Sequence, residues 1–166
     1  MLTCLFEDGG KGFLRHCTVG SILLNQDKDA ILLVRRAKEL SEGGKLAFPG
    51  GYMERNETLV QTALREAQEE TGFNVEIHNL FRINDNPNRP REDRQNVDFI
   101  FIGQILNKES NPDDEVSELV WHKLNSELNS DEIAFDHAET ISLYKDYIKE
   151  PFVLPVIAGG VFTKDS

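Results

Sequence analysis

The first part of the chain alternates short apolar runs with polar turns, a pattern typical of β-strands. Residues 18–24 are mostly apolar, and after a polar turn residues 31–35 form a second apolar run. We expect these two runs to pair as a hairpin. A loop rich in Glu, Gly and Lys (39–45) and a short apolar piece (46–48) then lead to a Pro-Gly-Gly sequence at 49–51.

A helix is predicted over residues 57–71, because apolar residues recur there at the spacing of one helix face. Asn56 precedes this segment as a candidate N-cap, and Gly72 follows it as a stop signal. We expect the apolar face to pack on a sheet. Its members are Leu59, Val60, Ala63, Leu64 and Ala67.

The second half of the chain predicts further strands and a second helix. The strands are 73–83, 97–106 and 116–124. The helix covers 136–148, and we expect the apolar tail 151–162 to be ordered against the body. Strands with helices between them favour an α/β sandwich. No stretch resembles an interdomain linker, so we expect residues 1–166 to form one domain.

Composition narrows the class of protein. The chain has 166 residues, of which 39% are hydrophobic, as in ordinary globular domains. Its longest apolar stretches, such as 99–102, are too short to span a membrane, and the N-terminus lacks the features of a signal peptide. We therefore expect a cytoplasmic protein that is not associated with membranes. The two cysteines, Cys4 and Cys17, are expected to be unpaired thiols.

The net charge of −11 argues against a nucleic-acid polymer as partner, because such binders need a basic face. An acidic protein can still bind a polyphosphate when metal ions mediate the contact. The alternative is that the acidic excess only makes the surface soluble.

Three glutamates on the first predicted helix form an acidic stripe that could bind metal ions. Glu66, Glu69 and Glu70 project from one side, because residues three and four apart are neighbours on a helix. Three close carboxylates repel each other, and Mg²⁺ prefers such oxygen ligands. Arg65 lies two turns after Glu57 and could reach back to it, which would orient the ligands. The alternative is an amphipathic helix with an acidic solvent face.

The spacing of these residues resembles the Nudix box, G-x5-E-x7-R-E-U-x-E-E-x-G-U, where U is apolar. Residues 51–73 match it at every fixed position, with Ala67 smaller than the usual aliphatic residue. The preceding sequences at 32–36 and 48–51 also resemble the family. The resemblance implies an α/β/α sandwich with a mixed β-sheet between helices. It also implies Mg²⁺-dependent hydrolysis of a diphosphate bond, with Mn²⁺ as a possible substitute.

The resemblance further implies roles for single residues. Glu66, Glu69 and Glu70 look like the metal-binding glutamates, and Gly50 matches the glycine whose carbonyl often joins them. Glu57 and Arg65 match the glutamate and arginine of the family that pair with each other and orient the metal ligands. The base that takes the proton of the attacking water is left open. The candidates are Glu69, Glu70, Glu115 as the first choice outside the helix, and Glu118 as the second.

Three features bear on the substrate, and each has a structural alternative. Arginines in the loop before residue 97 could pair with phosphates, or the loop could simply be exposed; they are Arg89, Arg91 and Arg94. Arg35 and Arg36 could contact phosphate or ribose, or form a surface pair. Phe135 could stack on a base and His137 could position the substrate, or Asp136 could cap the helix with Phe135 in the core.

The residues at 134–137 resemble the ADP-ribose pyrophosphatase-like subgroup. We therefore expect a small nucleotide substrate, with ADP-ribose or a related nucleoside diphosphate sugar first. A MutT-type pyrophosphatase of (d)NTPs is the alternative, and a non-catalytic nucleotide sensor is an alternative of another class. A homodimer is possible through the apolar tail, which could equally pack within its own subunit.

Overall fold

The computed structural model describes residues 2–89 and 95–158. The strands are β1 (Leu2–Leu5), β2 (Lys11–Leu14), β3 (Cys17–Leu24), β4 (Ala30–Arg36), β5 (Leu46–Ala47), β6 (Gly50–Tyr52), β7 (Phe73–Asn84), β8 (Val97–Lys108), β9 (Val116–Lys123) and β10 (Val156–Ala158). The α-helices are α1 (Leu59–Thr71) and α2 (His137–Lys149), and a short 3₁₀ turn, η1, covers Ser130–Glu132.

Strand β3 organises the main sheet. It pairs in parallel with β8 and antiparallel with β4 and β6, so the predicted hairpin of β3 and β4 is confirmed. Along the sheet the order is β10-β7-β8-β3-β4-β5, with β6 added beside β3 and β9 beside β4. Because parallel and antiparallel pairs occur together, the sheet is mixed, as expected.

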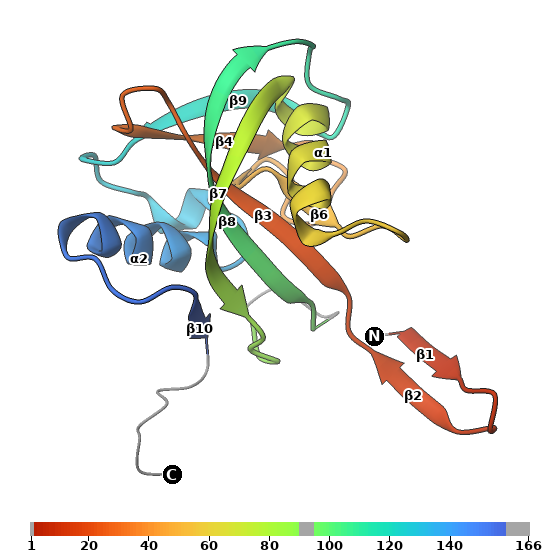
Figure 1. Ribbon diagram of the computed structural model, residues 1–166. Coiled ribbons are helices and arrows are strands. Elements are labelled where there is room, and N and C mark those ends of the chain that lie inside the picture. The colour runs from red at the N-terminus through yellow and green to blue at the C-terminus, as the bar shows by residue number, and fades with distance from the viewer. Residues whose placement is uncertain (1, 90–94, 159–166) are drawn as a thin grey trace, which may run out of the picture.

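One helix lies against each face of the sheet, α1 on one side and α2 on the other (Figure 1). Successive side chains of a strand point to opposite faces. Accordingly Ile22 packs with Ile141 and Tyr144 of α2, whereas its neighbour Leu23 packs with Ala67 of α1. These two apolar layers make the α/β/α sandwich, and α1 holds its acidic side at the edge of the sheet near β6.

The start and the apolar face of α1 differ from the sequence expectation. The N-cap is Thr58, whose side chain accepts a hydrogen bond from the Gln61 amide in a capping box, so the choice of Asn56 was wrong. Asn56 instead has a φ of 72° in the preceding turn. Val60 and Leu64 are 44% and 40% exposed, because only the narrower stripe that includes Ala63 and Ala67 faces the sheet.

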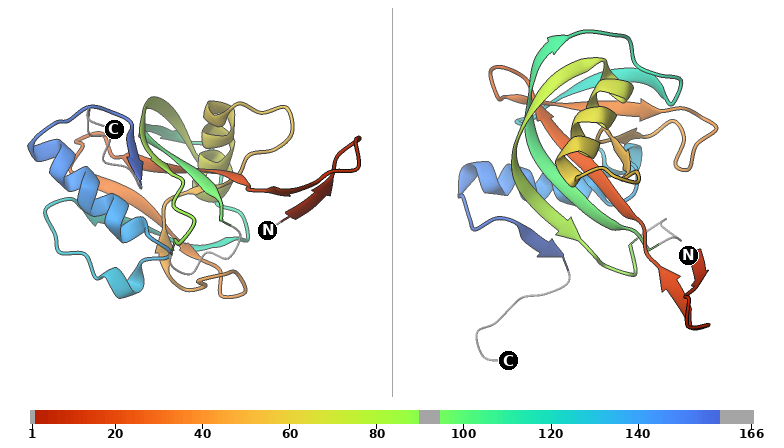
Figure 2. Two further views of the ribbon diagram at one scale, coloured as in Figure 1. Left: turned by 90° about the horizontal axis from the view of Figure 1, so that it is seen from below. Right: turned by 45° about the vertical axis from the view of Figure 1, so that its right-hand side comes forward.

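The chain ends contain two features that periodicity did not reveal. Strands β1 and β2 form a separate antiparallel hairpin that projects away from the body (Figure 2). At the other end, residues 156–158 pair in parallel with β7, so this part of the tail packs within its own subunit. The rest of the predicted tail, residues 159–162, lies outside the described residues. Among the described helices, none is long and apolar enough to cross a membrane.

Candidate active site

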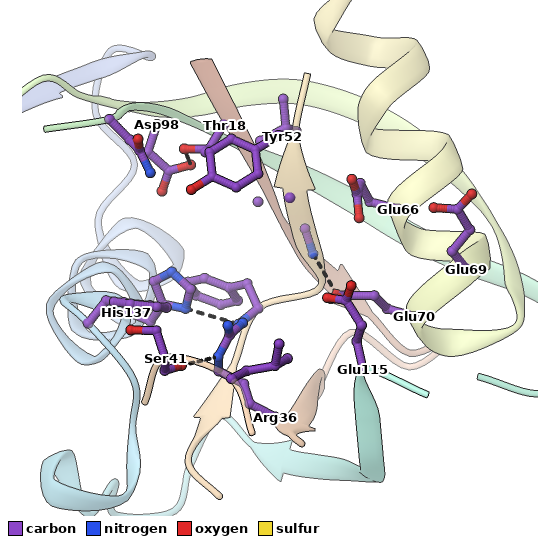
Figure 3. A pocket seen from close by; sticks show the side chains of 18 of the residues that line it. Thr18, Arg36, Ser41, Tyr52, Glu66, Glu69, Glu70, Asp98, Glu115 and His137 are labelled. Atoms are coloured by element: carbon purple, nitrogen blue, oxygen red, sulfur yellow. Dashed lines mark hydrogen bonds between the residues drawn. The ribbon is translucent and has the colours of Figure 1, made fainter. Parts of the chain in front are cut away.

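A cavity of about 760 Å³ lies between the acidic side of α1, the edge of the sheet and the segment that enters α2. This volume is in the range of small-molecule sites. The cavity has two chemically distinct ends (Figure 3): four glutamates occupy one, and Thr18, Asp98 and His137 lie at the other. The glutamates are Glu66, Glu69, Glu70 and Glu115.

Arg65 organises the acidic end. Its Nε and Nη2 donate to the two carboxylate oxygens of Glu57 at 2.7 and 3.0 Å. Its Nη1 donates to Glu66 at 2.8 Å and to Glu69 at 2.9 Å. These bonds to Arg65 hold the pKa of Glu57 down at about 2. The fork of the guanidinium therefore fixes the loop before α1 and two of the helix carboxylates at once.

Glu70 is the most buried carboxylate of the acidic end, with 5% of its surface exposed. Its Oε2 accepts a hydrogen bond of 2.8 Å from the Gly50 amide. The pKa of Glu70 is raised to about 8, chiefly by burial and also by the charges of Glu66 and Asp113, while the hydrogen bond from Gly50 opposes the rise. Burial likewise raises the pKa of Glu66, and the charges of Glu69 and Glu115 add to the rise, while Arg65 opposes it. If all were ionised, the carboxylates of the acidic end would carry more negative charge than the neighbouring arginines compensate.

This excess of oxygen donors and negative charge fits a hard divalent cation. As the side chains stand, no three His, Cys, Asp or Glu residues in the described ranges converge closely enough to hold a metal ion. In this arrangement each carboxylate already has a partner in the protein, since Arg65 donates to Glu66 and Glu69 and the Gly50 amide donates to Glu70. Glu66, Glu69 and Glu70 all line the same cavity, so their carboxylates are open to a common ligand.

The two glycines before α1 serve different purposes. A Cβ on Gly50 would lie 2.0 Å from the backbone oxygen of Val19, so the sheet could not keep its pairing there. A Cβ on Gly51 would instead lie 2.5 Å from the carboxylate of Glu66, a flexible group that can move away.

We therefore expect Gly51→Ala to fold with a nearly unchanged melting temperature but to bind divalent metal more weakly, by about 10-fold, because Glu66 is displaced. Calorimetric titration with Mn²⁺ measures the affinity, and thermal denaturation checks the fold. Gly50→Ala is the comparison and should lower the melting temperature. Normal metal affinity in Gly51→Ala would show that the position of Glu66 does not matter for the metal.

The other end of the cavity is built on a buried ionic network. Arg89 donates from Nε and Nη2 to the carboxylate of Asp136 at 2.9 and 2.7 Å, and its Nη2 lies 3.5 Å from Asp98. Thr18 donates to Asp98 at 2.9 Å. Burial raises the pKa of Asp98, whereas the Arg89 charge lowers it. Both acids and Arg89 are buried, so the network is a rigid wall of the cavity.

His137 belongs to the same wall. Its Nδ1 accepts a hydrogen bond of 3.0 Å from the Phe48 amide, and burial lowers the pKa of His137 to about 3. The ring is therefore neutral with its proton on Nε2. Asp136 precedes the helix but makes no side-chain capping bond, because its carboxylate binds Arg89 and Asn84 instead.

Of the residues predicted to contact the substrate, some line the cavity and others do not. Arg36 lines the cavity with its guanidinium 5.3 Å from the centre of the Phe135 ring, and Phe135 also lines the cavity. Arg35 does not line it. Its Nε binds Glu118 at 2.6 Å, so both Arg35 and the second-choice base Glu118 are directed elsewhere.

Three more predicted positions lie in or beside the loop before β8. Arg91 and Arg94 lie outside the described residues. Arg89 is buried and holds Asp136, so it is a wall residue and not the exposed phosphate ligand considered from the sequence. Glu115 lines the cavity at the same acidic end as the glutamates of α1 (Figure 3).

Sequence reasoning missed Thr18 and Asp98. Both are polar residues at the second position of mainly apolar strands, and they are register partners in the parallel pairing of β3 with β8. The polar residue in each apolar run was the available signal. Their contact could not be inferred, because 80 residues separate them and the parallel register was unknown.

Comparison with known proteins is consistent with this geometry. Residues 14–144 match the model of the NUDIX domain. The ADP-ribose pyrophosphatase of Methanocaldococcus jannaschii is 30% identical over 123 residues, which cover 74% of this chain and 69% of that protein. The 8-oxo-dGTP diphosphatase of Escherichia coli is 37% identical over 59 residues, covering 36% of this chain and 46% of that protein.

Solved structures agree in fold. A NUDIX hydrolase from Nitrosomonas europaea superposes with a TM-score of 0.74 at 26% identity, covering 90% of this chain and 81% of that chain. An ADP-ribose pyrophosphatase from Streptococcus suis superposes with a TM-score of 0.68 at 19% identity, covering 87% and 99%. Enzymes of this family use divalent metal ions and act on small nucleotides. The chain belongs to the Nudix family and is a pyrophosphohydrolase of that family.

Proposed function

We propose that this enzyme hydrolyses the diphosphate bond of ADP-ribose or a related nucleoside diphosphate sugar with Mg²⁺ as its metal. The observation that carries the proposal is the cavity with two ends, one rich in carboxylates and the other polar and aromatic. A nucleoside diphosphate sugar has the same division, with a charged diphosphate beside a flat base. The archaeal relative named ADP-ribose pyrophosphatase supports the same choice.

In this proposal the residues of the acidic end hold the metal and orient the diphosphate. Glu66, Glu69 and Glu70 supply carboxylate oxygens, and Arg65 keeps two of them in place. The bound metal would neutralise charge on the phosphate oxygens and lower the pKa of an attached water. Glu115 would accept the proton of the water that attacks phosphorus. The bond between phosphorus and the bridging oxygen breaks, and AMP and ribose 5-phosphate leave.

The test is a substrate panel of ADP-ribose, UDP-glucose, dGTP and 8-oxo-dGTP, each with Mg²⁺ and with EDTA. We expect the highest kcat/KM for ADP-ribose, with AMP as a product. The second candidate, a MutT-type (d)NTP pyrophosphatase, is supported by the similarity to the bacterial 8-oxo-dGTP diphosphatase. It predicts a higher kcat/KM for 8-oxo-dGTP, with pyrophosphate as a product.

Glu115→Gln is expected to lower kcat by about 10²-fold or more with little change in KM, because an amide cannot accept the proton of water. Glu118→Gln is the comparison, since Glu118 lies outside the cavity and binds Arg35. Steady-state kinetics at saturating Mg²⁺ measure both. A normal kcat in Glu115→Gln would remove Glu115 from the mechanism and leave the carboxylates of α1 as candidates for the base.

The cytoplasmic location, the single domain and the homodimer stay predictions. Light scattering coupled to size-exclusion chromatography tests the homodimer, and a monomeric mass at all concentrations would exclude it.

A further inference from the structure

Four neighbouring strands place a polar residue in one row across the sheet. Asn84 of β7 is the register partner of Asp98 in β8, which is the partner of Thr18 in β3, which is the partner of Tyr52 in β6. Register partners share a face of a sheet. Asp98, Thr18 and Tyr52 line the cavity together, at the end away from the glutamates (Figure 3).

Asp98 is held as a hydrogen-bond acceptor in this row. It is 5% exposed, and its Oδ1 accepts from Thr18 at 2.9 Å while its Oδ2 lies 3.5 Å from Arg89. An ionised carboxylate can accept about four hydrogen bonds, so acceptor capacity remains beyond these two contacts. A buried acceptor with spare capacity favours ligands that bring N–H or O–H donors and disfavours ligands that bring only acceptors.

His137 adds the opposite polarity to the same wall. Because its Nδ1 accepts from the Phe48 amide, its Nε2 carries the proton and can donate. The rings of Phe48 and Phe135 lie beside it, with centroids at 4.8 and 5.6 Å. A donor, an acceptor and aromatic faces in one wall suit the edge of a flat heterocycle better than they suit a sugar, which has hydroxyls but no aromatic face.

We propose that this end of the cavity binds the nucleobase, and that Asp98 selects purines carrying an amino group on the edge that faces it. The inference rests on the proposed function for the presence of a nucleotide and deepens it by naming how the base is chosen. A purine with a carbonyl in place of that amino group would direct an acceptor at the Asp98 carboxylate, and the two groups would repel.

The experiment compares binding of AMP and IMP, which differ in having an amino or a carbonyl group at this position of the purine. Isothermal titration calorimetry with Mg²⁺ gives the two dissociation constants for the wild type and Asp98→Asn. We expect the wild type to bind AMP about 10-fold or more tightly than IMP, the ratio that one hydrogen bond to a charged group produces. In Asp98→Asn the ratio should fall to about one or reverse, because the amide can donate to the carbonyl of IMP.

Matched variants separate this role from a general loss of structure. Asp131→Asn makes the same chemical change at an exposed site and should keep the wild-type ratio. Thr18→Val keeps the Asp98 carboxylate but removes the bond that orients it, so its ratio should fall below that of the wild type. If Asp98→Asn does not fold, the wild-type ratio and Thr18→Val still decide the question.

Equal binding of AMP and IMP by the wild type would overturn the inference, and so would an unchanged ratio in Asp98→Asn or Thr18→Val. Equal weakening of both nucleotides in Asp98→Asn would place Asp98 against the sugar and would overturn it as well. The readout does not depend on turnover. A preference for AMP without hydrolysis of ADP-ribose would reject the proposed function and leave this inference standing.

Discussion

Glu70→Gln is expected to abolish most turnover and, in the absence of metal, to make the fold more stable. Loss of residues that only support metal ligands typically costs 10- to 100-fold. Removing a carboxylate at the centre of the acidic end should therefore lower kcat by roughly 10²- to 10³-fold. The gain in stability follows from burial, because Glu70 is 5% exposed and no arginine bonds to its carboxylate in the described structure.

The pH dependence of the stability follows from the raised pKa of Glu70, which is about 8 instead of the ordinary 4.5. Between these values the unfolded chain has released the proton while the metal-free folded chain retains it. The unfolded state then binds fewer protons, so stability falls as pH rises from about 4.5 to about 8. Gln has no proton to lose. At neutral pH the variant should be more stable by about 1–3 kcal/mol, an order-of-magnitude value from the shift.

Thermal denaturation in EDTA at pH 5 and pH 8 tests this effect. We expect the melting temperature of Glu70→Gln to exceed that of the wild type more at pH 8 than at pH 5. Adding Mg²⁺ should raise the melting temperature of the wild type more than that of the variant. Glu76→Gln is the control, since Glu76 is exposed on β7. A variant that is less stable in EDTA, or one that retains turnover, would contradict the role given to Glu70.

Arg65→Lys is expected to weaken metal binding and turnover by about 10- to 100-fold while keeping the positive charge. The guanidinium bonds at once to Glu57, Glu66 and Glu69. A lysine ammonium is a single point of charge and cannot hold three carboxylates in a fixed fork. The carboxylates should then become less well oriented, so more Mg²⁺ should be needed for half-maximal activity.

Arg35→Lys is a matched control for this experiment. Arg35 also donates from Nε to a glutamate at 2.6 Å, but this pair lies outside the cavity. Steady-state rates measured over a range of Mg²⁺ concentrations separate a change in metal requirement from a change in kcat. If Arg65→Lys shows the wild-type Mg²⁺ requirement, or if Arg35→Lys has the larger effect, the fork of Arg65 does not organise the metal site.

The sequence predicted the acidic end of the cavity well, because that end is local. Residues 51–73 form one loop and one helix, and helix geometry alone brings Glu66, Glu69 and Glu70 to one side of the helix. The same locality made Thr58 a predictable cap, since Gln61 three residues later completes a capping box. Choosing Asn56 overlooked that second residue.

The end of the cavity away from the glutamates could not be predicted, because the residues that bind each other there are far apart in the sequence. Arg89 and Asp136 are 47 residues apart, and Asp98 meets Thr18 only through a parallel register. Arg35 and Arg36 illustrate the same limit. Both were considered as substrate contacts from the sequence, although adjacent residues of a regular strand face opposite sides of the sheet. Only Arg36 lines the cavity, and the strand pairing is irregular between the two residues, which the sequence does not reveal.

The most direct test of the account is the Mg²⁺ dependence of ADP-ribose hydrolysis by the wild type and Glu66→Gln, with AMP and ribose 5-phosphate measured as products. The account predicts no turnover in EDTA, turnover that rises and saturates with added Mg²⁺, and a loss of at least about 10-fold in the variant. Turnover that persists in EDTA, or that is unchanged when Glu66 is neutralised, would contradict a role for the acidic stripe in holding the metal.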